Sequence, residues 1–333
     1  MRKYIGVSVA IVALLAGTAI SARERVSPEC RRAIVKMCEM TGIKQCVTNR
    51  FAELDSGCRA EIVGRMKDRA RADGAKPLPT GAREVAFGDD PAQRYDLFMP
   101  RTNAPVPLIV FVHGGGWSIG DKRSGLGDKA THYNALGYAV ASINYRLVPQ
   151  GTVEQQAADV AAAVASLRKQ PGIDGSRVVV MGHSAGAHLA ALVASDTRYL
   201  GTAGIPVEAV RGVVLLDGAG YDVVRQMADP KNAVRSMYDK AFGTDPARQR
   251  ALSPITHAAA PNARDWLILP VASRADSTAQ SQDFAAALRM GASRVTVTPV
   301  PDSSHMKLNR NLGSDGDFAT EAVDAFVGAA FGR

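Results

Sequence analysis

The sequence predicts an α/β protein with an open, mostly parallel sheet and helices on both faces, behind a small cysteine-rich helical segment. Short apolar runs alternate with helical patterns from Ala82 onward. Runs such as residues 108–112 are apolar throughout, which is typical of strands buried on both faces. All four cysteines lie between residues 30 and 58. The 333 residues, 46% of them hydrophobic, therefore predict one large domain plus an appendage.

The expected elements follow from the periodicity of apolar residues. Eight strands are expected, at residues 84–87, 94–98, 108–112, 139–143, 177–181, 213–216, 266–271 and 295–300. Helices are expected at residues 128–136, 155–169, 184–194, 279–290 and 318–331. The first two strands have alternating patterns and are expected to pair antiparallel. Strand–helix alternation begins at the third strand, which indicates parallel pairing for the remainder.

The N-terminus has the pattern of a secretory signal peptide. Arg2 and Lys3 precede an uncharged apolar run over residues 4–20, and small residues follow up to Ala22. We expect cleavage near residue 22 and export to the periplasm or the medium. An uncleaved membrane anchor is the alternative, although the run is short for a membrane span and is interrupted by glycine, serine and threonine.

The cysteines fit an exported chain. They lie at Cys30, Cys38, Cys46 and Cys58, within a helical segment expected over residues 23–72. An even, clustered set indicates two disulfides, and four cysteines allow three connectivities that the sequence leaves open. One of them nests Cys38–Cys46 inside Cys30–Cys58. A zinc site is the alternative, but the spacing lacks a C-x-x-C pair. A linker is expected at residues 73–81, followed by the main domain at 82–333.

The net charge of +8 is partly local to this N-terminal segment. Residues 23–71 contain twelve basic and seven acidic side chains, spread around helical turns rather than clustered with aromatic residues. This pattern favours a solvated helical face over a nucleic-acid interface. Contact with an anionic envelope surface or a partner protein remains an open alternative for the segment. The oligomeric state is not predicted.

One stretch carries the clearest chemical signal. Four apolar residues, Val178 to Met181, lead into Gly182-His183-Ser184-Ala185-Gly186, and an alanine-rich helix follows directly. A serine on a tight strand-to-helix turn is the nucleophile elbow, and the flanking glycines relieve the crowding that such a turn creates. The turn also places the serine hydroxyl at a helix N-terminus, where negative charge is favoured. Ser184 is therefore the expected nucleophile.

A serine nucleophile needs a base and a carboxylate that orients the base. His305 is the expected base because it follows the last strand, whereas the other five histidines precede or adjoin the serine or are expected to be structural. Asp276 is the expected acid because it follows the strand at residues 266–271. Asp302 ranks second, and Asp265 lies at the wrong end of its strand.

The stretch His113-Gly114-Gly115-Gly116-Trp117 follows the third strand. Glycines let backbone N–H groups approach a developing oxyanion without obstruction from side chains. We expect the N–H groups of Gly114 or Gly115 and of Ala185 to form this hole. The stretch lacks the patterns of phosphate-binding loops.

Together these motifs resemble the α/β-hydrolase superfamily, specifically the hormone-sensitive-lipase-like and kynurenine-formamidase-like esterases. Asn144-Tyr145-Arg146-Leu147 also fits that pattern. The resemblance covers residues 82–333 and implies serine-dependent hydrolysis of carboxylic esters through an acyl-enzyme, with neither metal nor organic cofactor. Two departures are Val148-Pro149-Gln150 in place of the usual Ala-Pro-Glu, and the absence of a glycine commonly found before the aspartate that corresponds to Asp276.

An insertion at about residues 219–262 is the natural cap over an acyl pocket. Trp117, Tyr221 and Met237 are the expected substrate-binding residues, and the short cap favours small or medium acyl groups. We therefore expect a small-molecule ester as the substrate. An arylformamidase or other amidase with the same three residues is the second hypothesis, and a catalytically silent secreted binding module is the third.

Overall fold

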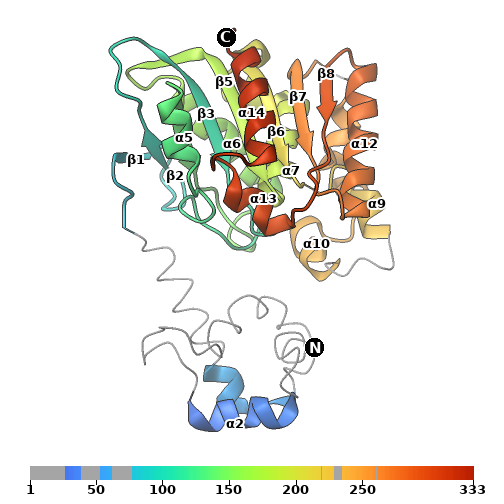
Figure 1. Cartoon of the computed structure of the whole chain (residues 1–333). Coiled ribbons are helices and arrows are strands. Elements are labelled where there is room, and N and C mark those ends of the chain that lie inside the picture. The colour runs from blue at the N-terminus through green and yellow to red at the C-terminus, as the bar shows by residue number, and fades with distance from the viewer. Residues whose placement is uncertain (1–26, 39–52, 62–76, 219, 229–234, 260) are drawn as a thin grey trace. The chain divides into compact units, whose positions relative to one another are not determined.

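The computed structural model describes residues 27–38, 53–61, 77–218, 220–228, 235–259 and 261–333 (Figure 1). The chain divides into two compact units, Met1–Pro77 and Leu78–Arg333, and the division falls inside the predicted linker. The predicted signal peptide and Cys46 lie outside the described residues. No helix in the described ranges has the length and apolar character needed to cross a bilayer.

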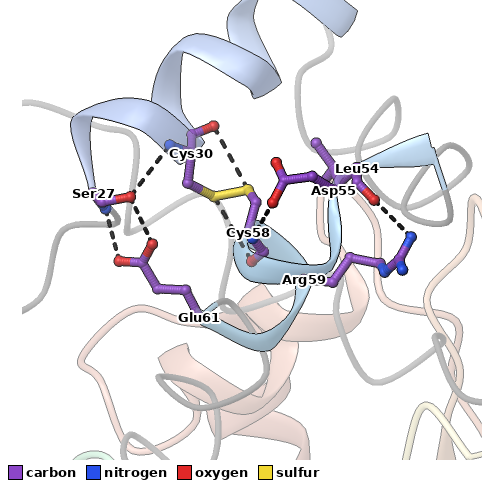
Figure 2. The surroundings of a disulfide bond; sticks show 7 residues. All are labelled: Ser27, Cys30, Leu54, Asp55, Cys58, Arg59 and Glu61. Atoms are coloured by element: carbon purple, nitrogen blue, oxygen red, sulfur yellow. Dashed lines mark hydrogen bonds between the residues drawn. A yellow bond between two sulfur atoms is a disulfide. The ribbon is translucent and has the colours of Figure 1, made fainter.

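The smaller unit is built around a disulfide between Cys30 and Cys58 (Figure 2). Cys30 lies on α2 (Pro28–Met37), and Cys58 lies on a helical stretch at residues 56–61. Ser27 caps α2, since its hydroxyl accepts the Cys30 N–H. The Glu61 carboxylate accepts hydrogen bonds from the Ser27 N–H and hydroxyl, both at 2.7 Å. The disulfide itself confirms the Cys30–Cys58 pairing of the nested scheme.

The larger unit contains the predicted eight-stranded sheet, in the order β1-β2-β4-β3-β5-β6-β7-β8. Its strands are β1 (Ala82–Ala86), β2 (Arg94–Phe98), β3 (Val106–Val112), β4 (Ala139–Ile143), β5 (Ile173–His183), β6 (Val210–Leu216), β7 (Asp265–Leu269) and β8 (Arg294–Val297). β2 pairs antiparallel with β1 and with β4, and the remaining neighbours are parallel. The predicted mostly parallel α/β architecture is confirmed.

Helices cover both faces because alternate side chains of the central strands point to opposite sides. Val110 and Val112 belong to the core shared with α6 (Val153–Leu167), α7 (Ala185–Ser195) and α12 (Ala275–Met290). Ile109 and Phe111 belong to the core shared with α5 (Lys129–Ala135), α13 (His305–Asn311) and α14 (Phe318–Ala330) (Figure 1). The sheet is therefore sandwiched, as its continuous apolar strands predict.

The insertion between β6 and β7 forms several short helices. They are α9 (Val223–Ala228), α10 (Arg235–Phe242), α11 (Pro246–Ala251) and the 3₁₀ turn η5 (Pro254–His257). Tyr238 and Phe242 of α10 are buried in the same core as the sheet. Two more short elements, α8 (Arg198–Thr202) and η4 (Val207–Ala209), precede β6. Helices this short carry too little periodicity for a sequence pattern to reveal them.

The local environment of His305 differs from expectation in one respect. The sequence places it in a loop, whereas the structure makes it the first residue of α13, behind the N-cap Ser304. The Ser304 hydroxyl accepts the Lys307 N–H at 3.3 Å. The helix has only seven residues, so its apolar pattern is too brief to be recognised in the sequence. Starting a helix fixes the backbone at His305.

Candidate active site

The site lies at the carboxyl ends of adjacent parallel strands. Ser184 directly follows β5 and Asp217 directly follows β6. The Ser184 N–H donates to the carbonyl of Leu216, the last residue of β6, at 3.1 Å. The Asp217 N–H donates to the carbonyl of Leu269, the last residue of β7, at 2.9 Å. The sheet ladder thus continues one residue past each strand and holds the two side chains at the same edge. Carboxyl ends of parallel strands are where sites form in such folds.

Ser184 occupies the strained turn that the elbow motif predicts. Its φ is 57° and its ψ is −122°, a region that residues with a side chain rarely adopt. A Cβ at Gly182 would lie 2.2 Å from the carbonyl oxygen of Gly186, and a Cβ at Gly186 would lie 2.2 Å from that of Val112. Both glycines are therefore required by close backbone contact.

The glycine loop after β3 lies against the serine. A Cβ on Gly114 would approach the Ser184 Cβ to 3.0 Å, and one on Gly115 would collide with the Ile119 carbonyl. Within the described residues, no backbone hydrogen bond engages the N–H groups of Gly114, Gly115 or Ala185. Ala185 begins α7 directly after Ser184, and Gly114 lies against the serine.

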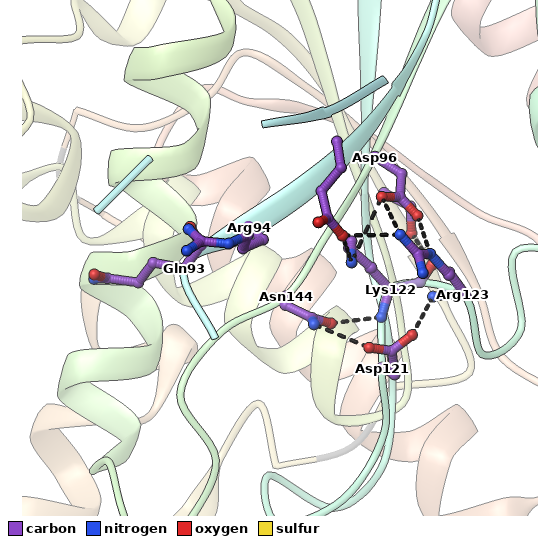
Figure 3. Close-up of polar contacts among 9 residues, drawn as sticks. Gln93, Arg94, Asp96, Asp121, Lys122, Arg123 and Asn144 are labelled. Carbon is purple, nitrogen blue, oxygen red and sulfur yellow. Dashed lines mark hydrogen bonds and ion pairs between the residues drawn. The ribbon is translucent and has the colours of Figure 1, made fainter. Parts of the chain in front are cut away.

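Charged contacts anchor the exit of this loop (Figure 3). The fully buried Asp96 of β2 accepts bonds from Arg123 Nε at 2.6 Å and Nη2 at 3.0 Å. Asn144, one residue beyond β4, accepts the Lys122 N–H at 2.5 Å and donates to Asp121 at 3.0 Å. A buried network with its partners satisfied is rigid. Segment 121–123 is thereby fixed to β2 and to the end of β4.

His305 is paired with Asp217. The Nδ1 atom of the histidine lies 2.6 Å from Oδ2 of the aspartate, whose side chain is fully buried. The carboxylate also accepts the Val271 N–H at 2.9 Å and the Ser277 hydroxyl at 2.8 Å, and it receives Nη1 of Arg274. It therefore has donors on both oxygens. Such an environment holds an aspartate ionised and in one orientation.

This pairing corrects the sequence analysis, which chose Asp276. The side chain of Asp276 is half exposed, and its Oδ2 atom lies 3.9 Å from Nη2 of Arg274. Asp302 is exposed, and its backbone oxygen accepts a hydrogen bond from the Lys307 ammonium. The reason is positional: Asp276 is already inside α12, whereas Asp217 directly follows β6 next to the site.

A signal for Asp217 was present in the sequence. Leu215-Leu216-Asp217-Gly218 places a charge at the carboxyl end of a buried strand, which is the same rule that selected His305. The aspartate also adopts a positive φ of 43°, which is uncommon outside glycine. Because the acid was expected after the seventh strand, Asp276 was predicted in place of Asp217.

The arrangement determines which nitrogen of His305 carries a proton. Nδ1 faces a carboxylate oxygen at 2.6 Å, and a lone pair there would be repelled, so Nδ1 carries the hydrogen. Nη1 of Arg274 lies 2.8 Å from the same nitrogen, and since both are donors they share the Asp217 oxygen. The Nε2 lone pair of His305 is consequently left to act as a base.

The electrostatics of Asp217 favour its charge. Burial alone would raise its pKa, but hydrogen bonds from His305 and the Val271 amide and the Arg274 cation outweigh it and lower the pKa to about 2. His183, which adjoins Ser184, behaves differently. Burial and the neighbouring His305 lower the pKa of His183 to about 3, so this residue is neutral. Its Nε2–H donates to the His305 carbonyl at 2.8 Å, which supports the start of α13.

The three predicted substrate-binding residues differ in their exposure. Trp117 and Tyr221 are buried, and Tyr221 stacks on Phe284 with ring centroids 5.0 Å apart. Met237 of α10 is half-buried and packs on the glycine loop, where its Sδ would lie 2.2 Å from a Cβ at Gly116. Of the three, Met237 is thus the one that is partly exposed beside the loop.

Among the described residues, no group of three or more histidine, cysteine, aspartate or glutamate side chains is placed to hold a metal ion. The chemistry that the described groups can perform is nucleophilic attack by a hydroxyl, assisted by an imidazole and backbone donors.

Comparison with known proteins decides the family. The BD-FAE family model matches residues 95–288, which is more than half of the chain. The chain belongs to the BD-FAE family of α/β-hydrolase esterases. This membership confirms the predicted superfamily.

Individual relatives agree with this assignment. A probable isoprenylcysteine alpha-carbonyl methylesterase from Oryza sativa is 39% identical over 115 residues, 33% of this chain and 27% of that protein. The match thus spans about a quarter of the relative's length. A kynurenine formamidase from Salmo salar is 27% identical over 250 residues, 73% of this chain and 81% of that protein. Among solved structures, esterase B from Lactobacillus rhamnosis superposes with a TM-score of 0.62 at 22% identity, covering 80% of this chain and 91% of that one.

The buried pairing of Asp217 predicts a pH-dependent contribution to stability. Because its pKa falls from the usual 3.8 to about 2 on folding, the stabilisation is complete above pH 4 and is lost as the pH falls through 2. We expect Asp217→Asn to unfold more easily than the native chain by roughly 2 kcal/mol at pH 6, with the difference shrinking below pH 4. Urea unfolding at pH 3 to 7 measures this. A constant difference down to pH 3 would contradict it, and Asp276→Asn is the half-exposed control.

Proposed function

We propose that this chain hydrolyses carboxylic esters through an acyl-enzyme on Ser184, with His305 as general base and acid. Asp217 takes the orienting role that the sequence analysis gave to Asp276. The observation that carries the proposal is the 2.6 Å contact between the fully buried Asp217 carboxylate and His305 Nδ1, at the strand ends that also present Ser184. A buried carboxylate in that position serves to fix the tautomer of a catalytic imidazole.

The sequence of proton transfers follows from this geometry. His305 Nε2 takes the hydroxyl proton as Ser184 attacks the ester carbonyl, and Asp217 remains ionised while it stabilises the imidazolium. The tetrahedral oxyanion is received by N–H groups of Gly114 or Gly115 and of Ala185. His305 then returns the proton to the leaving alcohol. Water repeats the sequence on the acyl-enzyme and releases the acid.

The contacts of the glycine loop support small or medium acyl groups. Met237 covers Gly116 closely, and Trp117 is enclosed by α10, with Tyr238 and Phe242 rings 5.0 and 4.8 Å from it. Side chains of the insertion thus press on the loop that would hold the oxyanion. These contacts favour short acyl chains on this side of the loop.

We expect the native chain to hydrolyse p-nitrophenyl esters, with turnover highest for short acyl chains between acetate and decanoate. Ser184→Ala should reduce kcat at least about 10³-fold because the nucleophile is removed. Release of p-nitrophenolate measures both. Equal rates for native and variant chains on every ester would overturn the proposal.

Formamide hydrolysis is the second candidate activity. It is favoured by the 27% identity to the Salmo salar kynurenine formamidase over 73% of this chain. The same triad could act on an amide carbonyl, with His305 protonating a leaving amine. Comparing kcat/KM for an aryl formamide with that for the matched aryl formate ester separates the two.

We predict that Asp217→Asn lowers kcat by about 10²- to 10⁴-fold, because an amide in that position accepts no strong bond from Nδ1–H and releases the tautomer of His305. Asp276→Asn should leave kcat near the native value, since that side chain is half exposed and separate from the imidazole. Initial rates on the best ester test the pair. The opposite ranking would restore Asp276 as the orienting acid.

We further propose that the chain is exported to the periplasm or the medium. The apolar run at residues 4–20 and the Cys30–Cys58 disulfide both support this, because disulfides persist in oxidising compartments. Fractionation of expressing cells, with mass spectrometry of the mature N-terminus, should find a chain that starts near residue 23. A cytosolic chain that retains Met1 would contradict the proposal.

A further inference from the structure

His188 joins three parts of the site. It lies on α7, one turn after Ser184, and its side chain is fully buried. Its Nδ1 atom is 3.2 Å from Nε1 of Trp117, in the glycine loop. Its Nε2 atom is 2.9 Å from the carbonyl oxygen of Leu252, in the insertion. One imidazole thus connects the nucleophile helix, the glycine loop and the cap.

Chemistry fixes the direction of both hydrogen bonds. An indole nitrogen can only donate, so Nδ1 of His188 accepts, and a carbonyl can only accept, so Nε2 carries the hydrogen. Burial lowers the pKa of His188 to about 4, with the Leu252 carbonyl opposing that shift, so the ring stays neutral. A neutral histidine of this tautomer satisfies both partners. The protonated form could not accept the Trp117 N–H.

Trp117 needs such support because its backbone is strained. Its φ is 60°, a conformation that costs energy for a residue with a large side chain. Its carbonyl oxygen accepts the Val148 N–H at 2.9 Å and Nε2 of Gln156 at 2.7 Å. Its indole N–H bonds to His188 alone among the described residues. Backbone and side chain are therefore each tied down.

The cap packs on the same two rings. Phe242 of α10 lies edge-on to His188, with centroids 5.3 Å apart, and edge-on to Trp117 at 4.8 Å. Edge-to-face contacts of this kind prefer a defined angle. The bond to Leu252 reaches the residue that caps α11. The orientation of the His188 ring thus depends on the insertion from two sides.

We propose that His188 is a positioning residue that holds the glycine loop in register with Ser184 through Trp117. Gly114 and Gly115 lie three and two residues before Trp117, so a displacement of the indole would move their N–H groups relative to the hydroxyl. The oxyanion develops only during reaction, and donors that are fixed in advance stabilise it most. The Trp117–His188 bond therefore contributes to turnover rather than to substrate binding. This inference rests on the proposed acyl transfer at Ser184.

Two substitutions separate the two hydrogen bonds. The side-chain oxygen of asparagine reaches roughly where Nδ1 of histidine lies, so His188→Asn can still accept the Trp117 N–H. The side-chain nitrogen of glutamine reaches roughly where Nε2 lies, so His188→Gln can still donate to Leu252 but leaves Trp117 without its acceptor. His188→Asn leaves the Leu252 carbonyl without its donor, and His188→Gln leaves the Trp117 N–H without its acceptor. Because each variant leaves one buried polar group unpaired, we expect the two to lose similar amounts of stability.

We expect His188→Gln to lower kcat by about 10- to 100-fold with little change in KM, because misplaced donors act on the transition state. His188→Asn should stay near the native kcat. Trp117→Phe, which keeps an aromatic ring but removes the N–H, should reproduce the loss of His188→Gln, and the double variant should be no worse than either. Thermal melting confirms that each chain is folded.

Equal losses in the glutamine and asparagine variants, a change confined to KM, or native kcat in a folded Trp117→Phe chain would overturn the proposal. The rate at which a fluorophosphonate labels Ser184 is a second readout with the same expected ranking, since the phosphoryl oxygen occupies the same donors. If the native chain is labelled but hydrolyses no ester, the proposed function fails while the ranking of labelling rates still tests His188.

Discussion

The buried carboxylate of Asp217 is the interaction on which the site depends. It receives donors from four directions: the imidazole of His305, the guanidinium of Arg274, the hydroxyl of Ser277 and the Val271 amide. A carboxylate removed from water is tolerated only when its oxygens are satisfied in this way. The same contacts bring together the ends of β6 and β7 and the starts of α12 and α13. The contacts that orient His305 therefore also hold these strand and helix ends together.

Around this carboxylate, backbone geometry positions Ser184 and the glycine loop. The elbow holds Ser184 at a positive φ because Gly182 and Gly186 allow the turn, the strand and the helix to approach within contact distance. The glycine loop lies against the serine for the same reason. Its far end is fixed by the Asp96–Arg123 pair, and its Trp117 end by His188 and the insertion. The glycine loop is thus held in place by contacts on both sides.

The insertion consequently has two roles in the proposed mechanism. It limits the space beside the glycine loop through Met237, and it supports the loop through the rings of Tyr238 and Phe242. A change in the insertion would then alter acyl preference and turnover together.

The sequence by itself determined the sheet, the strand-to-helix turn at Ser184 and the close approach of the glycine loop, because each depends mainly on local sequence patterns. A continuous apolar run is a buried strand wherever it pairs, and Gly182-x-Ser184-x-Gly186 contains every residue that its turn requires. His305 was found from its place after the last strand. Its membership in α13 was not, because seven residues give too short a pattern.

The partner of His305 was decided only by the tertiary structure. Asp217 and Asp276 both follow parallel strands, and sequence spacing alone does not say which carboxylate reaches an imidazole contributed by residue 305. The choice depends on strand order and on where α12 begins. Asp217 directly follows β6 and contacts His305, whereas Asp276 lies in the half-exposed first turn of α12. Burial of Trp117 and its bond to His188 have the same origin. These contacts join residues far apart in the chain, and only folding brings them within hydrogen-bonding distance.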